Sequence, residues 1–239
     1  MNWDALFTTL RLALCTSVLL IVIGIPISYW IAFTKWRWKF IVEAVVALPL
    51  VLPPTVLGFY VLVAIGPRSP LGAWYERLVG HGLQFTFEGL VVGSTLYSLP
   101  FAVQPIAAAF GAVERKLIEA SWMLGVSNLE TFFRVIVPAS WAGLLTGFVL
   151  SFAHTMGEFG VVLMVGGNIP GVTRTVSMDI YDRVQALDYS GAGITSLVLL
   201  VLSFLVLSIV YGLNRRTLGF FTSREGHVLG ADRRYTKSV

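Results

Sequence analysis

The chain has 239 residues, of which 56% are hydrophobic and only 13% are charged, and its formal net charge at pH 7 is +4. Soluble domains carry roughly one quarter charged residues, so this composition excludes an ordinary soluble protein and indicates an integral membrane protein. The positive charge does not indicate a nucleic-acid partner, because the basic residues lie at the ends of apolar segments, where orientation in the membrane and anionic lipid account for them.

Five apolar segments are long enough to cross a bilayer as helices. About 20 residues span the roughly 30 Å hydrocarbon core, and only helices leave no backbone group without a partner in lipid. The five spans that we predict cover about 12–33, 41–65, 89–111, 140–165 and 192–213. The sequence therefore predicts an all-α transmembrane domain over 1–216, followed by a basic tail over 217–239.

The basic residues orient these spans. Of the 17 lysines and arginines, most lie in the first and third links and in the tail, and the fewest lie on the opposite side. By the positive-inside rule, the N-terminus is expected outside, and the C-terminus and the link 112–139 are expected in the cytoplasm.

The second span contains three prolines, Pro49, Pro53 and Pro54. Proline removes a helix hydrogen bond and clashes with the preceding turn, so we expect this span to be broken or sharply bent. Two explanations are open at this point: the break lines a cavity, or it is a packing kink of the kind common in membrane helices.

The third span carries polar side chains near its inner half, among them Ser94, Ser98 and Gln104. Polar groups inside a membrane span are costly to expose to lipid, so they should face protein or water. The fourth span places small residues four positions apart, at Gly143, Gly147, Ser151 and Thr155. This stripe predicts a close helix contact, within the bundle rather than between subunits.

The link 112–139 is polar and has an internal order. Apolar residues recur at helical spacing over its first half, which predicts a helix at the membrane surface. Gly125 is suited to the position after a helix C-terminus, and Ser127 with Glu130 forms an S-x-x-E capping box for a second helix. Pro138 should end or bend that helix. The link is thus predicted to be two short helices joined at a glycine.

This link resembles the EAA loop of ABC-importer permeases, in which E-A-A is followed by a glycine and then by I-x-L-P. Glu119, Ala120, Gly125 and Pro138 match that pattern, whereas Ser121 replaces the second alanine and valines replace the isoleucine and leucine. The small residues at Ala120 and Ser121 are where another surface is expected to approach.

Three further segments, 49–58, 157–160 and 168–175, resemble the molybdate permeases, the transmembrane subunits of molybdate ABC importers. Sulfate/thiosulfate and tungstate permeases are similar but match the last segment less well. The resemblance implies the type I ABC-importer permease fold, a homodimer on two cytoplasmic ABC ATPase subunits, an extracytoplasmic molybdate-binding protein and a location in the cell (inner) membrane.

The resemblance also assigns roles to residues. The loop that couples to the ATPase would include Glu119, Ala120, Ser121, Gly125, Ser127, Glu130 and Pro138. The sequence has no G-x-x-x-x-G-K-[ST] phosphate loop, so the chain is not expected to hydrolyse ATP itself. No catalytic residue, cofactor or metal ligand cluster is predicted.

A path for a doubly charged oxyanion is expected to be lined by neutral hydrogen-bond donors. Cationic side chains should contact the anion only briefly, because tight binding would slow its release. The candidates for the path or its gate are Pro53, Pro54, Thr55, Ser94, Ser98, Thr155, Glu158 and Arg174. Two alternatives are open: the hydroxyls bond their own helix backbone, and Arg174 contacts the binding protein.

Glu158 would repel an oxyanion, and an ionised carboxylate donates no hydrogen bond, so a structural or gating role is favoured over direct ligation. His154 lies one turn earlier, where it could pair with Glu158. A hydrogen-bonded packing histidine is the better explanation of this residue.

Other functions fit less well. Tungstate or sulfate/thiosulfate import cannot be separated from molybdate import by physical chemistry, since these oxyanions are alike in charge. An ion-coupled secondary transporter predicts paired internal repeats, and the sequence shows none. A membrane enzyme would need a nucleophile, a base and an orienting group together, and none fall together here.

Overall fold

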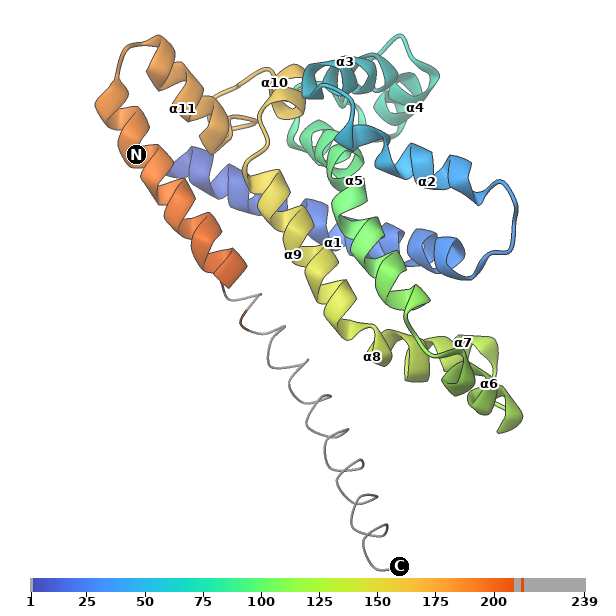
Figure 1. The fold of residues 1–239 in the computed structure, drawn as a ribbon. Coiled ribbons are helices and arrows are strands. Elements are labelled where there is room, and N and C mark those ends of the chain that lie inside the picture. The colour runs from blue at the N-terminus through green and yellow to red at the C-terminus, as the bar shows by residue number, and fades with distance from the viewer. Residues whose placement is uncertain (1, 209–211, 213–239) are drawn as a thin grey trace, which may run out of the picture.

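The computed structural model describes residues 2–208 and 212. Within them every regular element is a helix, which confirms the predicted all-α fold (Figure 1). Three helices are long and apolar enough to cross a membrane, and the number rises to five if each of two bent helix pairs is one span. The predicted tail 217–239 and the end of the last predicted span lie outside the described residues.

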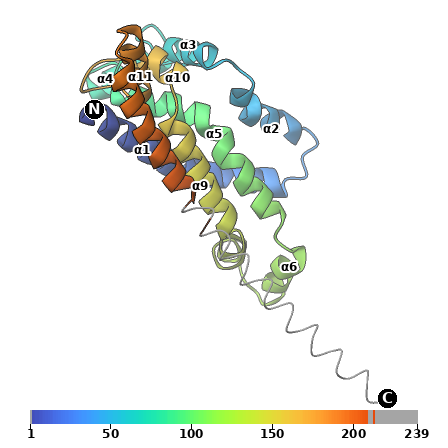
Figure 2. The ribbon, with the colours of Figure 1, turned by 60° about the vertical axis from the view of Figure 1, so that its left-hand side comes forward.

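Three long helices form the centre of the bundle: α1 (Trp3–Phe33), α5 (Phe87–Gly111) and α9 (Trp141–Met156). They lie side by side in both ribbon views (Figures 1 and 2). The small-residue stripe of α9 faces α5. A Cβ atom at Gly143 would clash with the Cβ of Ala109, and one at Gly147 would lie 2.9 Å from the carbonyl oxygen of Ala102. The predicted contact is therefore present, and it lies within the chain.

The second predicted span is broken, as its prolines indicate. Helix α2 (Lys39–Ala47) continues into the 3-10 turn η1 (Leu48–Leu50), and α3 (Pro54–Ala64) starts after a gap of three residues. The two halves meet at 109°. Pro54 begins α3, where a missing N–H costs nothing and the fixed φ suits the first helical turn.

The fourth predicted span differs from expectation, because it is not one helix over 140–165. Helix α9 ends at Met156, the chain unwinds over 157–159, and the short helix α10 (Gly160–Gly166) follows. Gly160 lets α10 begin directly against the start of α3, since a Cβ atom at this position would lie 2.6 Å from the Cβ of Pro54. Average hydropathy does not reveal this break, because the segments on both sides of it are apolar.

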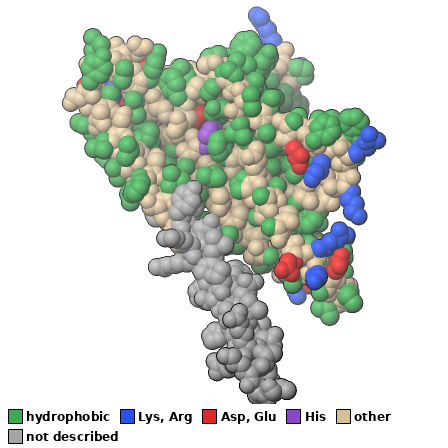
Figure 3. Space-filling model, in the orientation of Figure 1, with side chains coloured by type: hydrophobic (Ala, Val, Ile, Leu, Met, Phe, Trp, Pro, Cys, Tyr) green, Lys and Arg blue, Asp and Glu red, His purple; other side chains and the backbone are tan. Residues whose placement is uncertain are grey.

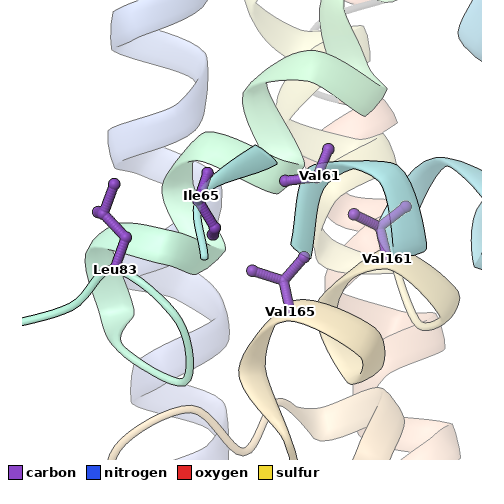
Figure 4. Close-up of a cluster of buried hydrophobic side chains, with 5 residues drawn as sticks. All are labelled: Val61, Ile65, Leu83, Val161 and Val165. Carbon is purple, nitrogen blue, oxygen red and sulfur yellow. The ribbon is translucent and has the colours of Figure 1, made fainter. Parts of the chain in front are cut away.

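Helices α3 and α10 pack together at one end of the bundle. Val61 of α3 and Ile65, the residue after its end, meet Val161 and Val165 of α10 in a buried cluster that Leu83 completes (Figure 4). Gly58 permits the close approach, since a Cβ atom there would lie 2.9 Å from the Cβ of Met164. Helices α3 and α10, each of which follows a break in a predicted span, thus stabilise each other by burying apolar surface.

The same end carries α4 (Pro70–Val79), α11 (Val176–Gln185) and the start of α1. Thr9 of α1 accepts a hydrogen bond from the backbone N–H of Val176 at 2.9 Å, which fixes α11 to the N-terminal helix. A last apolar helix, Tyr189–Ser208, lies at the edge of the bundle, and only 11% of its most apolar window is buried. The polar link 112–139 lies at the opposite end (Figure 1).

Candidate functional site

The polar link folds into a compact unit, which we call the bracket and define as residues 114–139. It contains α6 (Arg115–Met123), α7 (Asn128–Thr131), the π-helical turn η2 (Phe132–Ile136) and α8 (Val137–Ala139). The two predicted short helices are present, but the second is only four residues long before its hydrogen bonding changes to the π pattern.

Gly125 forms the turn between the two helices of the bracket. Its φ is +77°, its N–H bonds the carbonyl of Trp122 at 2.9 Å, and the N–H of Val126 bonds the carbonyl of Ser121 at 3.2 Å. These paired bonds close the C-terminus of α6, and the positive φ is a conformation that glycine adopts without steric cost.

The predicted capping box is only half formed. The hydroxyl of Ser127 accepts a hydrogen bond from the backbone N–H of Glu130 at 3.3 Å, as predicted. The carboxylate of Glu130 instead pairs with Arg134 one turn further on, at 3.0 Å. In the same way, Glu119 pairs with Arg115 at 3.0 Å. Both carboxylates therefore lie on the bracket surface beside cations.

Ser121 is buried within the bracket, so it is not exposed to another surface as its sequence pattern predicted. It is 8% exposed, and its hydroxyl lies 2.9 Å from the hydroxyl of Thr131, which is 1% exposed. This bond joins α6 to α7. Ala120 remains exposed, as expected. The sequence carried no signal for Thr131, because its role depends on how the two short helices fold back on each other.

Aromatic packing attaches the bracket to the bundle. The ring of Phe132 lies 5.2 Å from that of Tyr29 on α1 and 6.0 Å from that of Phe110 on α5, both in edge-to-face orientation. From α8 the chain turns into α9 with a bend of 71°. Pro138, which has no N–H to donate, lies just before this bend. A displacement of the bracket would therefore displace α1, α5 and α9 as well.

The outward face of the bracket is apolar. Large side chains with more than half of their surface exposed gather around its glycine turn: Met123 (89%), Leu124 (82%), Leu129 (69%) and Phe133 (61%). Figure 3 shows hydrophobic and charged side chains mixed at this end of the molecule. Exposed apolar groups with a charged rim are typical of a surface that binds another protein.

The residues predicted for a transport path fall into separate places. Ser98 of α5 lies 3.0 Å from the hydroxyl of Thr155 and 2.9 Å from Nδ1 of His154, both on α9. The ring of Phe101 stacks on His154 at 4.0 Å. His154 is thus a packing histidine that contacts Ser98, and the possible pair with Glu158 is not formed.

Glu158 lies in the unwound stretch between α9 and α10 and is 4% exposed. Among the described residues, neither of its carboxylate oxygens has a hydrogen-bond partner. Ser94 of α5 lies beside it, but outside hydrogen-bonding geometry. Ser94, Ser98 and Thr155 are all buried inside the chain, so a path lined by their hydroxyls stays a prediction.

The remaining candidates lie at the α3 and α11 end. Pro53 and Thr55 are exposed and flank Pro54, which contacts Gly160, so the segments 49–58 and 157–160 meet in space.

Arg174 is engaged in a polar network rather than free to meet an anion. Its Nη2 lies 3.2 Å from Asp182, and its Nε donates to the amide oxygen of Asn168 at 2.9 Å. Asn168 in turn donates to both carboxylate oxygens of Asp182 at 3.0 Å. Across residues 2–208 and 212, no three His, Cys, Asp or Glu side chains come together in a group that would hold a metal ion.

Comparison with known proteins identifies the family to which this architecture is similar. A family described as the binding-protein-dependent transport system inner membrane component matches residues 24–219. The molybdenum transport system permease protein ModB of Azotobacter vinelandii is 50% identical over 90% of this chain and 95% of its own length. ModB of Escherichia coli K12 is 31% identical over 91% of this chain and 97% of its own. A probable sulfate transport system permease protein cysT of Chlorella vulgaris is 30% identical over 87% of this chain and 77% of its own length.

Two solved structures share the fold. A bacterial ABC transporter that imports the acidic polysaccharide alginate superimposes with a TM-score of 0.72 at 15% identity, covering 89% of this chain and 78% of that one. The MetNI methionine ABC transporter, in an inward-facing conformation, gives a TM-score of 0.70 at 17% identity, covering 90% and 95%. The likeness to these two structures concerns the fold alone.

Proposed function

This chain belongs to the family of binding-protein-dependent transport system inner membrane components, and on that premise we propose that it is the permease subunit of an ABC importer that carries molybdate across the inner membrane. The bracket carries this proposal. A permease of this family without a phosphate loop would obtain its energy from an ATPase partner. The bracket presents an exposed apolar surface for such a partner, on a unit attached to three helices of the bundle.

Molybdate is favoured as cargo by sequence similarity. Identity to the molybdenum permease of A. vinelandii is 50% over almost the full length of both chains, whereas identity to the sulfate permease of C. vulgaris is 30%. Tungstate and sulfate/thiosulfate remain the alternatives to be tested, because oxyanions of equal charge offer few physical differences to a channel.

The partners follow from the family. The bracket would dock on a cytoplasmic ABC ATPase subunit, and the end with α3, α4, α10 and α11 would face an extracytoplasmic molybdate-binding protein. In this orientation the N-terminus lies outside, as the distribution of basic residues predicts. A second copy of the chain would complete the pathway, and the exposed apolar faces of the spans would contact that copy and membrane lipid.

The bracket would transmit nucleotide-driven motion as a rigid unit. The turn at Gly125 and the bond between Ser121 and Thr131 hold α6 against α7. The contact of Phe132 with Tyr29 and the bend before α9 would pass a displacement on to the bundle.

Within the bundle, we assign Glu158 a structural or gating role. It lies in the unwound stretch between α9 and α10, where its charge would repel an oxyanion. Ser94, Ser98, Thr155 and Thr55 stay candidates for neutral donors to the anion in another conformation. Arg174, which Asp182 and Asn168 hold in place, is better suited to shape the loop that meets the binding protein.

The test is reconstitution in proteoliposomes with the cognate ATPase and binding protein. Molybdate-loaded binding protein is expected to stimulate ATP hydrolysis and molybdate uptake, and excess sulfate should compete poorly. Uptake of sulfate in preference to molybdate would overturn the cargo assignment. Uptake that proceeds without the ATPase would overturn the assignment as an ABC permease.

A further inference from the structure

Two cavities adjoin where the carboxyl end of α1 meets the bracket. The first, which we call the head chamber, has a volume of about 460 Å³ and is lined among others by Tyr29, Phe33, Lys35, Arg115 and Trp122. The second, the tail groove, has a volume of about 400 Å³ and is lined by Ile25, Pro26, Tyr29, Asn128, Leu129 and Phe132. The two share Tyr29 and Asn128 in their linings, so they adjoin, and together we call them the cleft.

The lining of the head chamber is positively charged, which favours the binding of an anion. Among the described residues that line it, two are cationic and none is acidic. Lys35 is exposed and has no ion-pair partner in the described part of the chain. Arg115 contacts Glu119 through Nε, and its Nη groups make no ion pair with a described residue. Figure 3 shows lysine and arginine side chains gathered on this side of the molecule.

The tail groove is apolar and lies deeper along α1. Ile25 precedes the end of α1 at Phe33 by eight residues, which places it about 12 Å from that end at 1.5 Å per residue. Trp36 and Trp38, just beyond α1, are exposed, as tryptophans at the level of lipid headgroups commonly are. The chamber with the cations therefore lies at headgroup level, and the groove lies at the level of the acyl chains.

We propose that this cleft binds one anionic phospholipid, with its phosphate between Lys35 and Arg115 and one acyl chain in the tail groove. A soluble anion would leave the apolar groove empty. Lys35 and Arg115 have only one acid beside them, Glu119, so a zwitterionic lipid would bring a further cation into a site that is already positive. The bound lipid joins α1 to the bracket, because the cleft is lined by residues of both. Anionic lipid is thereby a structural part of the coupling end.

The cargo has no part in this site, so the binding test and the uptake test fail independently. In the binding test, the purified full-length chain in detergent is titrated with phosphatidylglycerol and with phosphatidylcholine, and bound lipid is counted by native mass spectrometry. One phosphatidylglycerol per chain is expected to bind in clear preference to phosphatidylcholine. Equal binding of the two lipids would overturn the proposal.

The head chamber is tested by Lys35→Gln, with Arg37→Gln as its matched control. Both residues lie in the link after α1, and only Lys35 lines the chamber. Lys35→Gln should weaken phosphatidylglycerol binding about fivefold, which corresponds to about 1 kcal/mol per basic residue at an anionic lipid surface, whereas Arg37→Gln should change it little. Equal losses in the two variants would show general charge attraction and contradict the site.

The tail groove is tested by Ile25→Trp, which fills the groove, with Val22→Trp as its control. Val22 lies on α1 one turn earlier, is 65% exposed and is not among the groove residues. The first variant should lose most of its phosphatidylglycerol binding, and the second should keep it. Retained binding in Ile25→Trp, or full competition by soluble glycerol phosphate, would show a site for a free anion and overturn the lipid assignment.

Discussion

The hydroxyl of Ser121 on α6 lies 2.9 Å from the hydroxyl of Thr131 on α7, and both side chains are buried within the bracket. Ser121 occupies the position of the second alanine in the E-A-A pattern, where alanine would have no hydrogen bond to offer. The serine in this chain therefore adds an internal bond to the bracket, and the proposed docking surface consists of the residues around it.

Removal of this bond should loosen the bracket. We expect Ser121→Ala and Thr131→Val each to lower the free energy of unfolding by about 1–3 kcal/mol, because each leaves one buried hydroxyl unpaired. The double variant should lose less than the sum of the two, since it leaves no unpaired group. The measurement is thermal unfolding of the four proteins in detergent, and strictly additive losses would show that the two hydroxyls do not interact.

The turn between α6 and α7 depends on Gly125. A valine there must adopt the φ of +77° that glycine has now, at a cost of about 1–3 kcal/mol for a strained backbone conformation. Gly125→Val should therefore bind the ATPase more weakly in a pull-down with the cognate subunit. Gly125→Asn is the control, because asparagine tolerates positive φ. No neighbouring atom lies within 4 Å of the added Cβ, so a loss in both variants would point to a direct contact of this position with the ATPase.

The contact between α5 and α9 leaves no room for a larger side chain at Gly147. A Cβ atom there would lie 2.9 Å from the backbone oxygen of Ala102. Gly147→Val should destabilise the protein by about 1–3 kcal/mol, as overpacking in a well-packed core does. Gly111→Val, at the end of α5 where nothing lies within 4 Å, is the control. Similar unfolding midpoints for the two variants would contradict the close approach of these helices.

The buried carboxyl group of Glu158 should lower the free energy of unfolding. It has no hydrogen-bond partner among the described residues, and a neutral amide of the same shape is cheaper to bury than a charge. We expect Glu158→Gln to raise the midpoint of thermal unfolding and to leave the molybdate concentration for half-maximal uptake unchanged. Glu88→Gln, at the start of α5, controls for loss of negative charge.

A lower unfolding midpoint in Glu158→Gln would mean that the carboxylate has a partner outside the chain, such as the second copy. A change in the molybdate concentration for half-maximal uptake would instead argue that Glu158 meets the cargo.

Asp188 should make the stability of the fold near α11 depend on pH in the acid range. Its carboxylate accepts hydrogen bonds from the N–H of Gly191 at 2.9 Å and from Arg183 at 2.9 Å, and these contacts lower its pKa. A depressed pKa in the folded state contributes stability that is present above the unfolded value of about 4 and is lost as pH falls through the folded pKa.

The matched variant for this prediction is Asp188→Asn, which keeps an acceptor for Gly191 but cannot titrate. The wild-type protein should be the more stable of the two at pH 7, and the difference should disappear in acid. Thermal unfolding between pH 3 and pH 7 measures it, and a difference that is constant over this range would contradict the assignment.

Local physical chemistry made much of the architecture predictable from sequence. The apolar runs identify the helices, because lipid leaves the backbone no other partners. Pro49, Pro53 and Pro54 predict the break in the second span, and Gly125 and Ser127 predict the ends of the bracket helices. The stripe with Gly143 and Gly147 predicts a close contact. Each of these features depends on residues near in sequence or on the surrounding solvent.

Features that depend on a partner from elsewhere in the chain were decided only by the tertiary structure. The predicted fourth span is broken at 157–159, and Gly160 begins α10 at a point where Pro54 lies against it. Likewise, Ser98 rather than Glu158 takes the ring nitrogen of His154, and Arg134 rather than the backbone takes the carboxylate of Glu130. The sequence by itself determined the all-α class, the apolar segments and the helix ends beside Gly125 and Ser127. Only packing decided which polar side chains meet, because hydrogen bonds and ion pairs act over a few ångströms and depend on how the helices are placed.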